Sequence, residues 1–260
     1  MKKFELTTEF ITNFLGIKLF RIKALVKFGD VKKGELGGFV EKEENLEHYG
    51  NAWVSGDAQV YGDAKVYGDA IVSGDAQVYG DAKVYGDAKV SGNAIVSGDA
   101  KVSGNAKVFG YAWVFGYANV SGDAKVFGYA RVLGYAIVNE NARVHENARV
   151  HEYAKVSGNA IVSGNAIVSG NAIVSGDAIV SGDQMYATVK GFGSNYRDTT
   201  FFVTKDGNVC VNCGCFSGTL EQFRKKVKET HKDTEYAKEY LAIADLMEMH
   251  FKEELEKIKK

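Results

Sequence analysis

The chain has 260 residues, a formal net charge of −1, 25% charged residues and 45% hydrophobic residues. This balance excludes general disorder, and the near-neutral charge argues against general binding of nucleic acid. The apolar runs are shorter than the roughly 18 residues of a membrane helix, and the N-terminus lacks a signal-peptide core. The three cysteines fit a reduced compartment, so we expect a cytoplasmic protein with no membrane partner.

Residues 1–48 come before a strict repeat and are expected to form an N-terminal β cap. Residues 17–25 alternate in part between apolar and polar side chains, which predicts a strand. Residues 45–48 stand in the register of the repeat that follows, so an imperfect first coil is expected there. A terminal repeat needs cover for its open strand edges, and this is the role that we predict for the segment.

From Tyr49 to Val180 the chain consists of 22 uninterrupted hexamers, mostly of the form (Ser/Tyr/Phe)-Gly-(Asp/Asn)-Ala-x-Val. Every hexamer ends in Val and has Ala two residues earlier. Alternate side chains of an extended strand share a side, so Ala and Val are predicted to point inward, while x and the residue after Val point outward. Gly with Asp or Asn is predicted to form each corner, because these residues best tolerate positive φ.

The number of hexamers in one coil follows from a twelve-residue segment that occurs twice. The segment Ser55–Val66 recurs unchanged as Ser73–Val84, an offset of three hexamers. Three short sides and three corners therefore make one coil of a triangular prism, with just over seven coils of about 4.8 Å each.

The small-x-aliphatic spacing of the hexamers resembles the hexapeptide repeats of left-handed parallel β-helices, and this resemblance implies the left hand. The predicted fold class is mainly β. A left-handed parallel β-helix, a triangular prism with three hexamers per coil, is expected over residues 49–183. It follows the N-terminal β cap of residues 1–48 and precedes a small α+β C-terminal module of residues 184–260.

Outward positions three hexamers apart stack on one side of the prism, and in its middle they change character. On two neighbouring sides a basic column runs beside a column of rings, and the corners that follow carry Tyr in place of Asp or Asn. At the same level of the prism, the third side carries Asn119, Ser121, Ile137 and Asn139 and has no aromatic residue there. The residues of this aromatic–basic surface are Lys107, Phe109, Tyr111, Trp113, Phe115, Tyr117, Lys125, Phe127, Tyr129, Arg131, Tyr135, Arg143, His145, Arg149, His151 and Tyr153.

Two interpretations of this surface stay open. Stacking for stability explains each column, since like rings in a ladder contribute about 0.5–1 kcal/mol per pair. It does not explain the tyrosine corners, where Tyr forgoes the backbone preference of Asp and Asn. Aromatic residues with Arg are typical of binding hot spots, so we favour a surface that binds a partner. The partner is a second copy, the C-terminal helix, or a foreign protein or small ligand.

Four successive outward positions after this surface carry isoleucine, where other coils carry Lys or Gln. Full exposure of these side chains would lower solubility. We predict that the C-terminal module or a second subunit covers Ile161, Ile167, Ile173 and Ile179.

The C-terminal module is predicted to contain a hairpin and two helices. Residues 199–204 and 208–212 flank a Lys-Asp-Gly turn, which indicates a β-hairpin. One helix is predicted after Ser217 and a second from about Asp233 to the end. The second has an apolar stripe that must pack against the prism, the hairpin or another copy; Tyr240, Met247 and Phe251 belong to it.

Candidates for catalysis are few. Many hexapeptide-repeat proteins are acyltransferases, and this resemblance implies a catalytic His near a subunit seam, helped by a loop ejected from the coil. Here the hexamers run without an insertion, and His145 and His151 are predicted to lie on different sides. We therefore expect no enzyme and no catalytic residue.

Candidates for metal and anion binding are weak as well. Cys210, Cys213 and Cys215, even with His231, lack the second cysteine pair of a typical zinc motif, and such cysteines are more often small buried residues. Arg197, after a glycine-rich turn, could hold an anion, but a linker is the favoured interpretation. We predict no metal and no cofactor.

The flanks carry a second resemblance. Residues 21–25, 28–31 and 36–46 resemble the opening of phage-encoded and prophage-encoded proteins with these repeats. Cys213-Gly-Cys-Phe-Ser-Gly-Thr-Leu-Glu-Gln-Phe223 and Lys238-Glu-Tyr-Leu-Ala are similar to their C-terminal module. The resemblance implies a phage or mobile-element origin and no particular activity.

We therefore expect an oligomeric, non-catalytic interaction or scaffold protein of phage origin. One use is counter-defence, by binding a host protein or a small ligand. The alternatives are an acyltransferase-like enzyme and a virion structural component. Nucleic acid is disfavoured as a partner, because nine Asp residues within the repeat oppose it.

Overall fold

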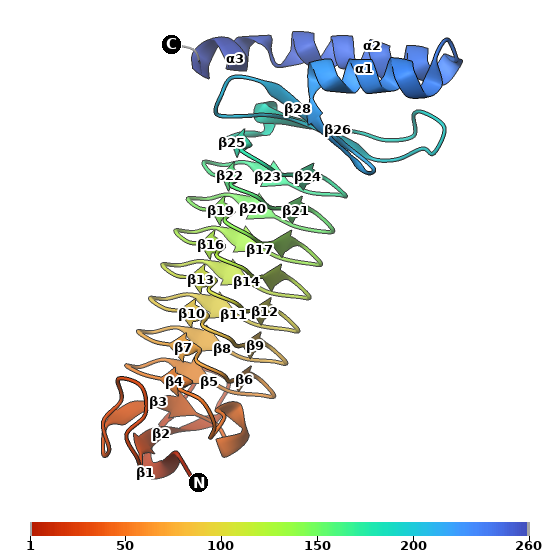
Figure 1. Ribbon diagram of the computed structural model, residues 1–260. Helices are drawn as coiled ribbons and strands as arrows, with labels where there is room; N and C mark the ends of the chain where they lie inside the picture. The colour runs from red at the N-terminus through yellow and green to blue at the C-terminus, as the bar shows by residue number, and fades with distance from the viewer. Residues whose placement is uncertain (1, 259–260) are drawn as a thin grey trace.

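A computed structural model describes residues 2–258 and shows three parts in a row (Figure 1). A twisted N-terminal sheet lies at one end of a long column of coils, and a small sheet covered by helices lies across the other end. The predicted class is confirmed, since the chain is a mainly β, parallel β-solenoid with a small C-terminal α+β module. None of the helices within residues 2–258 combines the length and the apolar character that crossing a bilayer requires.

The coils stack their two-residue strands into three parallel sheets, which form three sides of the solenoid. The strands of the first side are β4 (Trp53–Val54), β7 (Ile71–Val72), β10 (Lys89–Val90), β13 (Lys107–Val108), β16 (Lys125–Val126), β19 (Arg143–Val144), β22 (Ile161–Val162) and β25 (Ile179–Val180). Those of the second side are β5 (Gln59–Val60), β8 (Gln77–Val78), β11 (Ile95–Val96), β14 (Trp113–Val114), β17 (Arg131–Val132), β20 (Arg149–Val150) and β23 (Ile167–Val168). Those of the third side are β6 (Lys65–Val66), β9 (Lys83–Val84), β12 (Lys101–Val102), β15 (Asn119–Val120), β18 (Ile137–Val138), β21 (Lys155–Val156) and β24 (Ile173–Val174).

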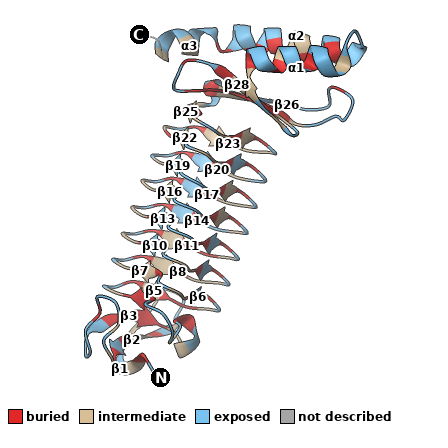
Figure 2. Ribbon diagram, in the orientation of Figure 1, coloured by how far each residue is buried: buried red, intermediate tan, exposed pale blue. Residues whose placement is uncertain are grey.

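The interior of the solenoid is built from the alanine and valine of each hexamer. All of these side chains from Ala52 to Val180 are fully buried, while most of the residues between and after them are half-buried or exposed (Figure 2). Strands three hexamers apart pair in register, for example Lys107 with Lys125 and Val108 with Val126. Backbone bonds join the coils, as where the Lys107 N–H donates to the Ala124 carbonyl at 2.9 Å. The alternation therefore produces a continuous apolar core, to which each side of a coil contributes one alanine and one valine.

The corners turn at the second residue of the hexamer, which is glycine in all but three hexamers. Gly110 and Gly128 have φ of 72° and 69°, and the other corner glycines are similar. Among the described residues of the repeat, Asp, Asn and Tyr corner positions do not adopt positive φ. The expectation that Asp and Asn share the left-handed conformation is wrong, because one glycine per corner is enough to turn the chain. Tyr at the next position therefore carries no backbone penalty.

The N-terminal part extends the solenoid as well as capping it. Strands β1 (Phe4–Thr12), β2 (Lys18–Ala24) and β3 (Leu36–Val40) are antiparallel neighbours, and β3 then pairs in parallel with β5. Beyond the short helix η1 (Glu43–Asn45), Leu46 forms an isolated parallel bridge with Val66. The first coil therefore begins before the strict repeat, and about eight coils result in place of just over seven.

Within the solenoid, the carbonyls of each coil accept hydrogen bonds from N–H groups of the preceding coil. The first coil has no complete coil before it, and side chains donate to its carbonyls instead. The Asn45 side-chain amide donates to the carbonyls of Gly62 and Ala64 at 3.0 and 2.9 Å. The buried Lys3 ammonium donates to the Ala52 carbonyl at 2.8 Å and lies 3.4 Å from two neighbouring carbonyls. Such pairing matters because a buried carbonyl without a donor costs about 1–3 kcal/mol.

Burial of Lys3 predicts a pH dependence of stability. Burial lowers the pKa of Lys3 from 10.5 to about 8, so between these values the unfolded chain binds more protons than the folded chain. Stability is therefore expected to rise with pH through this window, by at most about 3 kcal/mol. The measurement is the free energy of unfolding of wild type minus that of Lys3→Met at pH values from 7 to 11. A flat or falling difference would contradict the prediction.

The C-terminal module contains more strands than the predicted hairpin. After the short helix η2 (Asp183–Met185), an antiparallel sheet runs in the order β26 (Tyr186–Val189), β27 (Thr199–Val203), β28 (Val209–Cys213) and β29 (Phe216–Thr219). The expected hairpin is its central pair, β27 and β28. Helices α1 (Leu220–His231), α2 (Glu235–His250) and α3 (Lys252–Ile258) lie on the side of this sheet away from the coils (Figure 1). The predicted single second helix is thus divided at Phe251.

The C-terminal module also closes the last coil by hydrogen bonds. The Ile167 N–H donates to the Asp183 carboxylate at 2.8 Å, and the Ile173 N–H donates to the Thr200 hydroxyl at 3.0 Å. The Lys205 ammonium pairs with Asp177 at 2.9 Å. Side-chain oxygens thus accept hydrogen bonds from the free N–H groups of the last coil, and side-chain nitrogens donate to the free carbonyls of the first coil. Both ends of the backbone hydrogen-bond ladder are completed in this way.

Candidate interaction surface

The structure places the aromatic–basic surface on two neighbouring sides, as the spacing predicts. Lys107, Lys125 and Arg143 stack on the first side through β13, β16 and β19. Trp113, Arg131 and Arg149 stack on the second side through β14, β17 and β20. The third side presents Asn119 and Ile137 at the same level.

The rings of this surface form continuous ladders. The stacked pairs, with centroid separations of 4.8–5.1 Å and interplanar angles of 0–14°, are Phe109–Phe127, Phe127–His145, Tyr111–Tyr129, Tyr117–Tyr135 and Tyr135–Tyr153. The Arg131 guanidinium lies 5.0 Å from the centre of the Trp113 ring. The spacing of the rungs is that of neighbouring β-strands, so the backbone itself sets the stacking distance.

The inner rings of the two three-ring ladders, Phe127 and Tyr135, present only their edges to the surroundings. Each is stacked above and below, so its faces are occupied by its neighbours. The corner tyrosines remain open, with Tyr129 at 61% exposure, and Trp113 is 41% exposed. The surface is therefore a set of apolar ridges flanked by the cations of the basic columns.

The backbone argument for the tyrosine corners is corrected by this geometry. Because positive φ falls on the preceding glycine, Tyr111 and Tyr129 occupy their corners without strain. What distinguishes these corners is the large apolar area that they expose. That area, together with the flanking Arg and Lys, still favours contact with a partner.

Glutamates replace the corner glycine three times in one coil, a feature that sequence reasoning missed. Glu140, Glu146 and Glu152 have φ of 57°, 58° and 60°, a region that costs an L side chain about 1–2 kcal/mol. Their carboxylates accept hydrogen bonds of 2.5–2.6 Å from the N–H groups of the glycines one coil above, Gly158, Gly164 and Gly170. These charge-assisted bonds offset part of the backbone cost. The signal was available as Glu at the glycine position of successive hexamers.

Each histidine of the surface lies beside one of these glutamates. His145 Nδ1 is 3.7 Å from Glu146, and His151 Nδ1 is 3.9 Å from Glu152. His145 follows β19 on the first side and His151 follows β20 on the second. The two rings therefore belong to separate sides within one chain, as the spacing predicts.

A second ladder, which sequence reasoning also missed, is already covered by the chain. Tyr61 and Tyr79 on the second side stack at 4.9 Å with an interplanar angle of 7°. They pack with Leu19, Ile11 and Ile17 of the β1–β2 hairpin, and Tyr61 is only 2% exposed. Burial, with Tyr79 nearby, raises the pKa of Tyr61 to about 12.

The isoleucines near the last coils are all half-buried. Ile161 pairs with Ile179, which packs against the continuous core, and the carbonyl of Ile167 accepts a 2.6 Å bond from the Tyr186 hydroxyl. The Ile173 carbonyl accepts a bond from the Asn212 amide at 2.8 Å. Contacts from the C-terminal module thus reach this end of the solenoid.

The apolar stripe of the second predicted helix packs inward within the module. Tyr240, Met247 and Phe251 are buried in the core that also contains Phe223 of α1. The Phe223 and Tyr240 rings meet edge to face at 5.7 Å. This stripe therefore holds α2 on α1 and the small sheet.

The cysteines divide between two environments. Cys213 and Cys215 line a pocket of about 260 Å³ in the C-terminal module, together with Arg197 and His231, whereas Cys210 does not. Burial raises the pKa of Cys210. Within residues 2–258, no group of three or more His, Cys, Asp or Glu side chains has the arrangement of a metal site.

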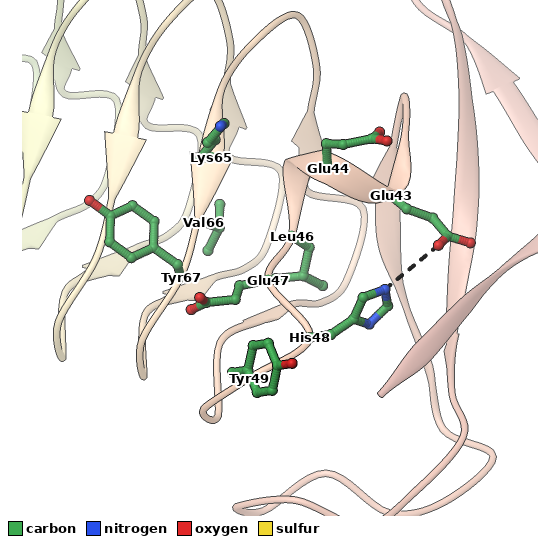
Figure 3. Close-up of a pocket in the computed structure, with 9 residues that line it drawn as sticks. All are labelled: Glu43, Glu44, Leu46, Glu47, His48, Tyr49, Lys65, Val66 and Tyr67. Carbon is green, nitrogen blue, oxygen red and sulfur yellow. Dashed lines mark ion pairs between the residues drawn. The ribbon is translucent and has the colours of Figure 1, made fainter. Parts of the chain in front are cut away.

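A further pocket of about 430 Å³ lies at the N-terminal end, where Glu43, Glu47, His48 and Tyr67 are among the lining residues (Figure 3). Figure 3 shows His48 pointing toward Glu43, with 3.6 Å between Nε2 and the carboxylate. Glu43 also pairs with Lys2 at 2.6 Å, which lowers its pKa, and Glu47 accepts a bond from the Gly68 N–H. These carboxylates are thus used within the chain, in closing the first coil.

Comparison with known proteins agrees with the architecture. Residues 58–74, 154–170 and 168–182 match a family model described as the YdcK beta solenoid repeat. No curated protein matches the chain. The matched segments all lie in the solenoid, so the chain is a β-helix repeat protein.

Proposed function

We propose that this chain is a non-catalytic interaction protein that binds a partner protein through the aromatic–basic surface. The observation that carries the proposal is the pair of uncovered ladders on adjacent sides, flanked by cations. Exposed apolar area next to Arg is typical of interface hot spots. The third side, with polar and mixed residues at the same level, offers no such combination.

The ladder geometry favours a protein over a planar ligand or a base that would have to insert between the rungs. Stacking of a base needs a free ring face, and the inner ladder rings have both faces occupied. Opening a rung would separate strands that are joined by backbone bonds. Ring edges and ridges at strand spacing suit the side chains of a protein surface instead.

The resemblance of the flanks to phage and prophage proteins sets the context of the proposal. A phage-derived chain with a recognition surface fits a counter-defence role, in which a host protein is sequestered in the host cytoplasm. A homo-oligomer would use the same surface for a second copy. An acyltransferase-like enzyme and a virion component remain the competing classes.

The test is recovery of a partner from infected cells with matched variants. Phe109→Ala with Arg131→Ala is expected to reduce recovery of a specific host protein at least tenfold, because one ring of a ladder and one cation are lost. The control pair, Lys101→Ala with Asn119→Ala on the third side, is expected to leave recovery unchanged. Quantitative mass spectrometry reads the result, and circular dichroism checks that both variants are folded.

Other outcomes separate the alternatives. Equal recovery from both variants would move the binding site off this surface. A dimer by light scattering that dissociates in the Phe109→Ala, Arg131→Ala variant would assign the surface to self-association. Acetyl-CoA turnover lost in His145→Ala or His151→Ala would overturn the non-catalytic assignment.

A further inference from the structure

We infer that the pocket of about 260 Å³ in the C-terminal module binds a small aromatic phosphate ester, with Arg197, Lys226 and His231 as its cations. The residues that line this pocket come from the loop after β26, from β28 and β29, and from helices α1 and α2. None of them belongs to the aromatic–basic surface. The inference therefore goes beyond the proposed function and is independent of it.

The pocket gathers positive charge that the chain does not neutralise. Arg197, Lys226 and His231 line it, and the lining contains no carboxylate. Within residues 2–258 these three cations make no ion pair. Arg224, on the same helix as Lys226, is by contrast paired with two carboxylates of α2 at 2.7 and 2.6 Å. An anionic ligand would supply the missing negative charge.

The end of helix α1 accounts for only one of these cations. His231 is the last residue of α1, where a cation interacts favourably with the free carbonyls. This effect falls off within the last turn, and Lys226 lies more than one turn earlier. Arg197 comes from a different element, the loop between β26 and β27. The helix end therefore does not explain why Arg197 and Lys226 meet at one pocket.

Two glycines leave room for polar groups of the pocket. A Cβ at Gly214 would collide with the Arg197 guanidinium, and a Cβ at Gly193 would collide with the Tyr240 hydroxyl. Both glycines have positive φ, 61° and 71°. The backbone thus comes close to the two side chains and fixes where the guanidinium and the hydroxyl lie.

The pocket offers a neutral donor beside its cations. Burial, together with the neighbouring Cys213 thiol, raises the pKa of Tyr240 to about 12, so its hydroxyl keeps its proton and can donate to an anion. Glu239, the neighbour of Tyr240 in α2, lies outside the lining and accepts a hydrogen bond from the Gly193 N–H at 2.8 Å. An anion in the pocket would therefore meet donors of three kinds: guanidinium, ammonium and phenol.

The walls of the pocket favour a ring on the ligand. The Phe223 centroid lies 5.5 Å from that of Phe216 and 5.7 Å from that of Tyr240, and His231 lies 5.6 Å from Tyr240. These rings are tilted or edge to face, at 35–87°, so they do not occupy one another's faces as the ladder rings do.

The size and charge of the pocket narrow the class of ligand. A cavity of about 150 Å³ is enough for benzene, and drug-sized ligands use about 300 Å³ or more. A pocket of about 260 Å³ therefore has room for one ring with a charged group. Two or three cations match the charge of a phosphate monoester better than that of a single carboxylate.

Phenyl phosphate is the probe, and isothermal titration calorimetry with the full chain is the measurement. Saturable binding of one molecule per chain is expected. Inorganic phosphate lacks the ring and benzoate carries one negative charge, so each is expected to bind at least about tenfold more weakly. Equal binding of inorganic phosphate, equal binding of benzoate, or no saturable binding of phenyl phosphate would overturn the inference.

Matched variants locate the site. Arg197→Gln and Lys226→Gln are each expected to weaken binding of phenyl phosphate at least about tenfold, because each removes a charged donor. Lys225→Gln removes the same charge from the next position of α1, which does not line the pocket, and should leave binding unchanged. Circular dichroism checks that the variants are folded. An equal loss for Lys225→Gln and Lys226→Gln would contradict the assignment.

The cysteines provide a second measurement on the unmodified chain. Cys215 is exposed and lines the pocket, whereas Cys210 does not line it. Saturating phenyl phosphate is expected to slow alkylation of Cys215 by N-ethylmaleimide at least about fivefold and to leave Cys210 unaffected, as read by mass spectrometry. An unchanged rate at Cys215 would place the bound ester elsewhere and overturn the inference.

The variants of the two sites keep the two proposals separate. The Phe109→Ala, Arg131→Ala variant is expected to bind phenyl phosphate as the wild type does. Loss of phenyl phosphate binding in that variant would contradict the independence of the pocket from the aromatic–basic surface.

Discussion

Val126→Asp is expected to lower the free energy of unfolding by more than about 4 kcal/mol, because it places a carboxylate in a core without partners. Val126 is completely buried between Val108 and Val144 of the neighbouring coils. The surrounding inward residues are Ala and Val, so the structure offers no donor to the new oxygens.

Chemical denaturation and hydrogen exchange measure this effect. In a solenoid each coil contacts only its neighbours, so protection should be lost first in the coils that flank residue 126. Lys125→Asp is the matched control, since its side chain lies on the outside of the same strand. A stability loss as large for Lys125→Asp would show that charge, and not burial, causes the effect.

Gly128→Val is expected to destabilise the chain by about 3 kcal/mol, for two additive reasons. Gly128 has φ of 69°, which a β-branched residue adopts only with strain. A Cβ at this position would also lie 2.9 Å from the Glu146 nitrogen and 3.2 Å from its Cα in the coil above. Backbone atoms held in a ladder cannot move away cheaply.

Two control variants separate these reasons, with thermal and chemical unfolding as the measurement. Gly176 has φ of 65°, but a Cβ there would meet nothing within 4 Å. Gly176→Val should therefore show the conformational cost alone, about 1–2 kcal/mol. Tyr129→Val, outside the left-handed region, should lose mainly ring stacking with Tyr111. Equal losses for Gly128→Val and Gly176→Val would refute the steric contribution.

The solenoid could be predicted from the sequence because its contacts repeat with the sequence. A period of six defines the sides, and the identity of Ser55–Val66 with Ser73–Val84 defines three sides per coil. Once the period is known, stacking follows by arithmetic, so Phe109 had to lie beneath Phe127. The Ala and Val positions likewise require no information beyond strand alternation.

The ends of the molecule could not be predicted in the same way. The cover of Tyr61 by Leu19 joins residues far apart in the chain without any repeat to reveal the pairing. The ammonium of Lys3 beneath Ala52 is another such contact, and ordinary sequence reasoning places lysine at the surface. Long-range packing of a unique segment depends on shape, which local patterns do not carry.

The sequence was enough to predict which residues of the aromatic–basic surface stack in columns. It was not enough to predict how their rings are oriented or which residue turns each corner. The stacking of ring faces, and hence the presentation of edges, required the ring angles of pairs such as Tyr117 and Tyr135. The corner conformation also required the structure, since glycine and not Asp or Asn carries positive φ. In contrast, the placement of His145 and His151 on separate sides followed from their spacing of one hexamer alone.

The two end modules contact the coils at the two ends of the solenoid, and this has a consequence for how the gene can change. Duplication or deletion of a block of three hexamers in the middle of the solenoid would preserve the inward alanines and valines and the cap contacts. The distance between the two ends would then change by about 4.8 Å for each coil added or removed. Unequal recombination between near-identical hexamers could therefore lengthen or shorten the solenoid without any change in the N-terminal cap or the C-terminal module.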